Sequence, residues 1–81
     1  MPSRLAAALR RFASRSTKLE REILKNPDFR SLCEDYGEAV DALDRWSRSN
    51  QPPSVQRALE YQRLVIDLEQ EIEIHIGRRS E

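Results

Sequence analysis

The sequence predicts an all-α protein, and three observations predict this class. Charged residues make up 35% and hydrophobic residues 38% of the 81 residues, with two glycines in all, which suits solvent-exposed helices better than a sheet. Two proline-containing sites divide the chain into three segments. Within each segment, apolar residues recur at alternating intervals of three and four. We therefore expect a single small helical domain over residues 1–81, with helices at about 4–25, 27–48 and 54–76 and a short tail at 77–81.

The first segment is predicted to be a basic amphipathic helix with a weak apolar stripe. The stripe consists of Leu5, Leu9, Phe12, Ser16, Leu19 and Ile23. Continuing this register past Asn26 would place Arg30 rather than Phe29 on the stripe. The helix should therefore break or kink at Pro27.

Pro27 is predicted to begin the second helix, because proline fits the first position of a helix. Asn26 is a suitable N-cap, and Asp28 places a negative charge where the helix dipole favours it. The stripe that follows consists of Phe29, Leu32, Tyr36, Ala39, Leu43 and Trp46. The acidic residues of this segment fall off the stripe, so the carboxylates are expected to face solvent rather than to form a reactive site.

The polar segment SRSNQPPS, residues 47–54, is predicted to end the second helix, and Ser54 can cap the third. The third helix, which Gly77 can terminate, has a stripe with the same spacing: Ala58, Tyr61, Val65, Leu68, Ile72 and His75. Further apolar residues lie off that stripe: Val55, Leu59, Leu64, Ile66, Ile74 and Ile76. One neighbouring helix cannot cover so wide a surface, so the last five of these are predicted to form an interface with the first segment or with another copy of the chain.

The short loop predicts that the second and third helices are antiparallel neighbours in a hairpin. The predicted hairpin seam consists of Phe29, Leu32, Tyr36, Leu43, Trp46, Val65, Leu68 and Ile72. The surplus apolar surface favours a homodimer over a monomer. Two hairpins, each with coiled-coil spacing and an additional N-terminal helix, would then close as a helical bundle in the oligomer.

The run LKNPDFRSLCEDYGEAVDAL, followed after a polar loop by YQRLVIDLEQEIEIHI, resembles the YdcH-like family of small bacterial helical-hairpin proteins. The matching features are the Asn-Pro-Asp-Phe turn and the apolar positions Phe29, Leu32, Tyr36, Leu43, Leu64, Leu68 and Ile72. The resemblance covers about residues 19–76. It implies a bacterial protein with a helical-hairpin fold, and it implies little about activity because the family is poorly characterised.

The charge is divided unevenly along a chain whose net charge is zero. Residues 1–25 carry seven basic and two acidic residues, which leaves an equal negative excess in the remainder. The possible basic docking face consists of Arg4, Arg10, Arg11, Arg15 and Lys18. Such a face can dock on an anionic membrane or on nucleic acid, and an arginine-rich start free of acids also occurs in targeting segments. The interpretation that we favour is a solvated face that pairs with acidic residues of the other helices.

The sequence has no pattern typical of an enzyme, such as a glycine-rich phosphate loop or a Ser/His/Asp set. The only histidine, His75, lacks the Glu-x-x-His pattern of metal-binding bundles, because Ile72 stands three residues before it. Cys33 has no CxxC partner and is interpreted as a small buried residue rather than a nucleophile. We therefore predict no catalytic residue, no cofactor and no metal site, and a metal or redox site around His75 and Cys33 is the least favoured hypothesis.

A single cysteine cannot form an intrachain disulfide, and no apolar run approaches the ~18 residues of a membrane span, so a cytoplasmic protein is expected. The predicted function is a protein-interaction or assembly module that acts by helix–helix packing, with a second copy or an unknown protein as partner. The alternative is a peripheral binder that docks its basic N-terminal helix on an anionic membrane or on nucleic acid.

Overall fold

The computed structural model describes residues 4–50 and 54–77. The elements are α1 (Ala6–Arg11), the 3-10 turn η1 (Ala13–Arg15), α2 (Ser16–Lys25), α3 (Pro27–Arg48) and α4 (Ser54–Ile76). These residues include no strand, which confirms the all-α prediction. None of the helices in this part of the chain is both long and apolar enough to cross a membrane. Residues 51–53 of the predicted loop and 78–81 of the predicted tail lie outside the described residues.

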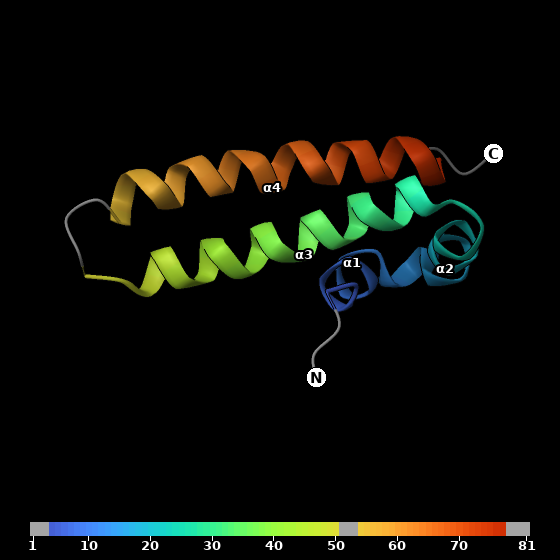
Figure 1. The fold of residues 1–81 in the computed structure, drawn as a ribbon, viewed down its shortest axis with the longest axis horizontal. Helices are drawn as coiled ribbons and strands as arrows, with labels where there is room; N and C mark the ends of the chain where they lie inside the picture. The colour runs from blue at the N-terminus through green and yellow to red at the C-terminus, as the bar shows by residue number, and fades with distance from the viewer. Residues whose placement is uncertain (1–3, 51–53, 78–81) are drawn as a thin grey trace.

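The two long helices, α3 and α4, lie side by side and run in opposite directions along the longest dimension of the molecule (Figure 1). The short helices α1 and α2 pack beside the first half of α3, near the C-terminal end of α4. The half of α3 and α4 nearer their connecting loop extends beyond α1 and α2. We call this part the loop half. It comprises residues 39–50, which include the end of α3, and residues 54–66 of α4.

Local hydrogen bonds define where the long helices begin. The Asn26 side-chain oxygen accepts bonds from the backbone N–H groups of Asp28 and Phe29, both at 3.1 Å, so it caps α3 in the way the sequence predicts. The Ser54 hydroxyl, at the start of α4, donates to the Ser49 carbonyl at 3.2 Å and so ties the two ends of the loop together. Gly77 ends α4 with a φ of 81°, a conformation that glycine adopts without a steric penalty.

The prediction of one continuous helix over residues 4–25 is wrong. The α-helical conformation stops at Phe12, whose φ and ψ are −112° and 39°, and resumes at Ser16 after the η1 turn. The break turns the Phe12 ring into the core, where the residue is 2% exposed. Serines and alanines around this point supply no apolar anchor that would hold a straight helix against α3. Burial of the aromatic ring therefore outweighs the helix propensity of the segment.

The hydrophobic core lies where α1, α2 and the end of α4 meet the first half of α3. It consists of Ala8, Phe12, Leu19, Ile23, Phe29, Cys33, Tyr36, Ala39, Leu68, Ile72 and Ile76. Gly37 lies at the close approach between α1 and α3, because the Arg4 backbone carbonyl occupies the space that a Cβ at position 37 would need. The core therefore belongs to one end of the molecule rather than to the full length of α3 and α4.

The predicted seam residues divide into two groups. Phe29, Tyr36, Leu68 and Ile72 are buried, and Leu32, Leu43, Trp46 and Val65 are half-buried. Leu32 and Val65 pack against the core, whereas Leu43 and Trp46 lie in the loop half, outside the core cluster. Burial thus decreases along the seam because α1 and α2 cover only one end of it.

The predicted interface residues on α4 differ in exposure. Ile76 is 1% exposed and belongs to the core, because it faces the neighbouring helices of the same chain, which is compatible with the predicted contact with the first segment. The other four predicted interface residues, Leu59, Leu64, Ile66 and Ile74, are between 42% and 68% exposed. Val55, near the start of α4, is exposed as well.

Candidate functional site: the groove between α3 and α4

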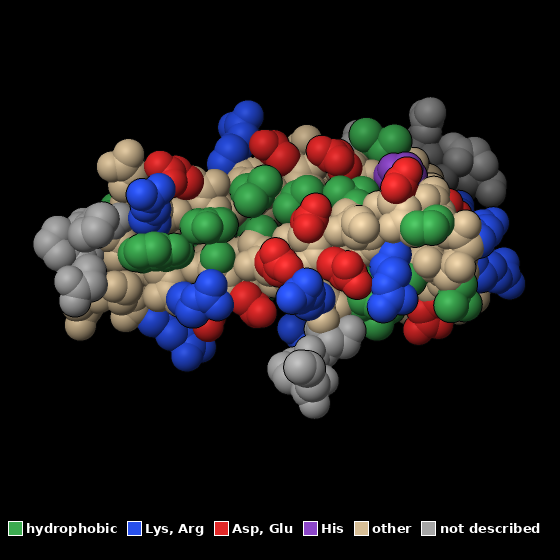
Figure 2. Space-filling model, viewed as in Figure 1, with side chains coloured by type: hydrophobic (Ala, Val, Ile, Leu, Met, Phe, Trp, Pro, Cys, Tyr) green, Lys and Arg blue, Asp and Glu red, His purple; other side chains and the backbone are tan. Residues whose placement is uncertain are grey.

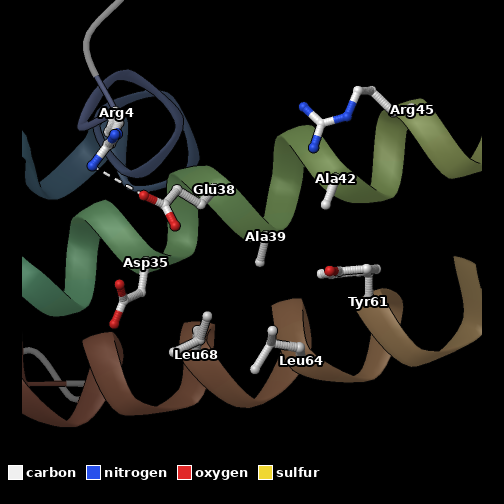
Figure 3. A pocket seen from close by; sticks show the side chains of 9 residues that line it. All are labelled: Arg4, Asp35, Glu38, Ala39, Ala42, Arg45, Tyr61, Leu64 and Leu68. Carbon is white, nitrogen blue, oxygen red and sulfur yellow. Dashed lines mark ion pairs between the residues drawn. The ribbon is translucent and has the colours of Figure 1, made fainter. Parts of the chain in front are cut away.

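A groove of about 540 Å³ runs between α3 and α4, mostly over the loop half. Its floor consists of Ala39, Ala42, Tyr61, Leu64 and Leu68, and its rim of Arg4, Asp35, Glu38 and Arg45. Figure 3 shows the two alanines on α3 facing Tyr61, Leu64 and Leu68 on α4. On the same face of the molecule, hydrophobic side chains follow the boundary between the long helices, with charged residues on both sides (Figure 2).

The charged residues of the rim are not equivalent. Arg4 and Glu38 form an ion pair of 3.0 Å, so their charges largely offset each other (Figure 3). Asp35 and Arg45 are both exposed, and neither forms an ion pair with any described residue. In Figure 3 they lie at opposite ends of this stretch of α3, with Asp35 extending toward α4 and Arg45 on the side of α3 away from α4. The groove therefore has an apolar floor with one negative and one positive charge available at its ends.

Two smaller apolar hollows lie elsewhere on the surface. One, of about 260 Å³, is at the loop end and is lined by Trp46, Val55 and Leu59 together with Ala58 and three serines. The other, of about 280 Å³, lies beside α1 and α2 and includes Leu9 and Leu24. The exposed apolar surface thus occupies several places rather than one continuous face.

The predicted basic docking face is largely engaged inside the chain. Besides the pair that Arg4 makes, Arg11 contacts Glu69 at 3.3 Å and Arg15 contacts Glu73 at 4.0 Å. Arg15 also donates to the carbonyl of Gly77 at 2.7 Å. The remaining two residues of that face, Arg10 and Lys18, are exposed and make no ion pair within the described part of the chain. The two guanidinium groups of Arg11 and Arg15 lie 5.2 and 5.7 Å from the centre of the Phe12 ring, so they also cover an apolar residue.

The structure adds a polar contact that the sequence reasoning missed. The Tyr36 hydroxyl donates to Glu69 at 2.6 Å, and the same carboxylate oxygen accepts from Arg11. Burial, and then the hydrogen bond to Glu69, raise the pKa of Tyr36 well above its usual value. A buried tyrosine needs a partner for its hydroxyl, and that requirement was the available signal for an acceptor on the facing helix. The contact joins α1, α3 and α4 through one carboxylate.

The surroundings of Cys33 and His75 bear on the hypothesis of a metal or redox site. Cys33 is buried in the core, and that burial, with a smaller contribution from the negative charge of Glu34, raises the pKa of its thiol to about 11. The His75 ring packs against Phe29 with ring centres 5.1 Å apart. Residues 4–50 and 54–77 contain no group of three or more His, Cys, Asp or Glu side chains that could hold a metal ion. Cys33 therefore belongs to the core, whereas His75 is an exposed residue whose ring contacts Phe29.

Comparison with protein-family models found no matching family, and comparisons with curated proteins and with solved structures found no match.

Proposed function

We propose that the protein is a non-catalytic interaction or assembly module that acts by packing its helices against a partner, and that the partner is a second copy of the chain. The observation that carries the proposal is the exposure of large apolar side chains on α4, where Val55, Leu59, Leu64 and Ile66 are between 42% and 70% exposed. Each square ångström of such surface removed from water contributes about 25 cal/mol. Covering these residues is therefore a source of binding energy.

Successive residues of an α-helix turn by about 100°, which places these side chains on two flanks of α4. Leu59 and Ile66 are seven residues apart and share one flank with Val55, whereas Leu64 lies on the other flank and lines the groove. Exposed apolar patches rimmed by charged residues are typical of protein–protein contact sites. The proposed closure is a helical bundle in which antiparallel α3–α4 hairpins, of the kind found in YdcH-like proteins, supply the contacting faces.

The alternative function, docking of the basic N-terminal segment on an anionic membrane or on nucleic acid, is less well supported. Three of its five residues, Arg4, Arg11 and Arg15, pair with acidic residues of α3 or α4. A charge that is already paired contributes less to attraction of an outside phosphate. Two exposed cations, Arg10 and Lys18, remain for such a contact.

Sedimentation equilibrium of the unmodified chain from about 1 to 100 µM tests the proposal. A reversible monomer–dimer equilibrium in this range is the expected result, and a strict monomer would contradict self-association. A parallel assay measures co-sedimentation with anionic vesicles, and gel shift with duplex DNA, at low and high salt. Strongly salt-dependent binding by a monomer would support the docking alternative instead.

A further inference from the structure

We propose that a second copy of this chain packs its own α3–α4 groove face onto the groove, with Asp35 of each copy opposite Arg45 of the other. This inference rests on the proposed function, because it assigns a surface and a geometry to self-association. It selects the groove over the flank of α4 that carries Leu59 and Ile66.

The first argument is charge complementarity. Arg4 and Glu38 are paired with each other at 3.0 Å, which leaves Asp35 and Arg45 as the rim charges that the described residues do not neutralise. They are ten residues apart on one helix, about 15 Å at a rise of ~1.5 Å per residue, so they cannot pair within the chain. A partner that offers a positive charge and a negative charge at the same separation, in reversed order, would pair with both.

The second argument is that this chain is itself such a partner. A two-fold axis lying in the plane of the groove, perpendicular to α3, places α3 antiparallel to α3 of the second copy. If the axis crosses α3 midway between positions 35 and 45, Asp35 meets Arg45 of the other copy, and the reciprocal pair forms by symmetry. This one position of the axis therefore pairs all four rim charges of the dimer, as two Asp35–Arg45 ion pairs.

The third argument is shape. The two-fold axis would cross α3 between Ala39 and Ala42, which are only 2% and 5% exposed, so these small side chains leave the groove open but offer little surface to the second copy. Across the groove, Leu64 of α4 lies level with these alanines, so it would approach its own counterpart near the axis (Figure 3). An exposed leucine at the centre and charges at both ends form the apolar core and polar rim of a protein interface.

The test reverses each charge separately and then mixes the two variants. In Asp35→Arg positions 35 and 45 are both positive, and in Arg45→Asp both are negative. Each variant alone should dimerise about tenfold or more weakly than the unmodified chain, because two attractive contacts become repulsive. An equimolar mixture should form a heterodimer at near the original affinity, since every contact then joins opposite charges.

The mixture also controls for folding, because a variant that failed to fold would not be rescued by its complement. Glu20→Arg is a matched control: it makes the same charge change at an exposed position of α2, outside the groove lining and away from the proposed two-fold axis, and it should leave the dissociation constant unchanged. Sedimentation equilibrium measures the self-affinities, and one fluorescently labelled variant titrated with the other measures the heterodimer.

Two results would overturn the inference, and they differ in what they say about the proposed function. If the unmodified chain dimerises and neither reversal changes its affinity, while Ile66→Glu abolishes the dimer, association uses the other flank of α4 and self-assembly stands. If the unmodified chain stays monomeric at 100 µM, the groove does not hold a second copy and self-assembly fails as well.

Discussion

Replacing Gly37 by alanine tests how closely α1 docks on α3. Gly37 is a buried residue inside α3, and the Arg4 backbone carbonyl stands where the new Cβ would be. A backbone carbonyl cannot rotate away as the end of a flexible side chain can. The added methyl group must therefore displace the start of α1.

Two opposing effects determine the magnitude of the change. At an open helical site, glycine to alanine stabilises a protein by about 0.5–1 kcal/mol. Overpacking at a well-fitted contact costs about 1–3 kcal/mol, and more if the helix detaches, because Phe12 would then leave the core. The expected net result for Gly37→Ala is a decrease of about 1–2 kcal/mol in the free energy of unfolding.

Urea denaturation followed by circular dichroism measures this difference, at one fixed protein concentration because any dimerisation adds to apparent stability. The matched background is a chain that lacks residues 1–4 and therefore the Arg4 carbonyl. In that background Gly37→Ala should raise stability by about 0.5–1 kcal/mol, because only helix propensity is left. If the substitution stabilises the full chain as well, α1 does not make this contact and the reasoning is refuted.

Three further substitutions test the cap, the core and the thiol. Asn26→Ala should lower the free energy of unfolding by about 0.5–2 kcal/mol in urea denaturation. Asn26→Ser should lower it less, because serine is also a good N-cap. Ile72→Ala, at a fully buried position, should lower the free energy of unfolding by about 2–5 kcal/mol. Leu43→Ala, at a half-buried position, should lower it by less than about 2 kcal/mol, and equal losses would contradict a core confined to one end of the molecule. Since the folded state raises the pKa of Cys33 from 9.0 to about 11, its neutral thiol stabilises the fold fully below pH 9, and this contribution is lost as pH rises through about 11. The free energy of unfolding should therefore fall over that range, and fall less in Cys33→Ala.

The bounds of α3 and α4 were accessible from the sequence because their signals are local. Asn26 and Pro27 act within one turn of the helix they begin, and the polar loop after Arg48 ends it. The break between α1 and α2 has no such signal. No proline or glycine stands between Phe12 and Ser16, and the chain bends there because of what the Phe12 ring contacts in the folded state. Local propensity cannot report that contact.

The same distinction applies to α4. Its periodicity showed that more apolar residues were present than one neighbour could cover, but not which of them a neighbour covers. Ile76 is buried because it lies on the face of α4 that the other helices cover, whereas Ile66 is 44% exposed on an outer flank of the same helix. The sequence therefore predicted an excess of apolar surface, and the tertiary arrangement decided where the excess lies. The groove depends on the same arrangement, since its lining comes from α3, α4 and Arg4, which precedes α1.

The distribution of charge also connects the fold to the choice between the two functions. Glu69 accepts from both Tyr36 and Arg11, and Glu73 lies one turn further along α4, facing Arg15. The arginines that would make the N-terminal segment attractive to phosphates therefore help to hold that segment on α4. Docking of these arginines on an anionic surface would compete with those contacts, leaving Glu73 without Arg15 and Glu69 with its bond from Tyr36 but without Arg11. The proposed association through the apolar groove requires no such exchange, because Arg4 remains paired with Glu38, and Asp35 and Arg45 are the two charges of the groove rim that pair with no described residue.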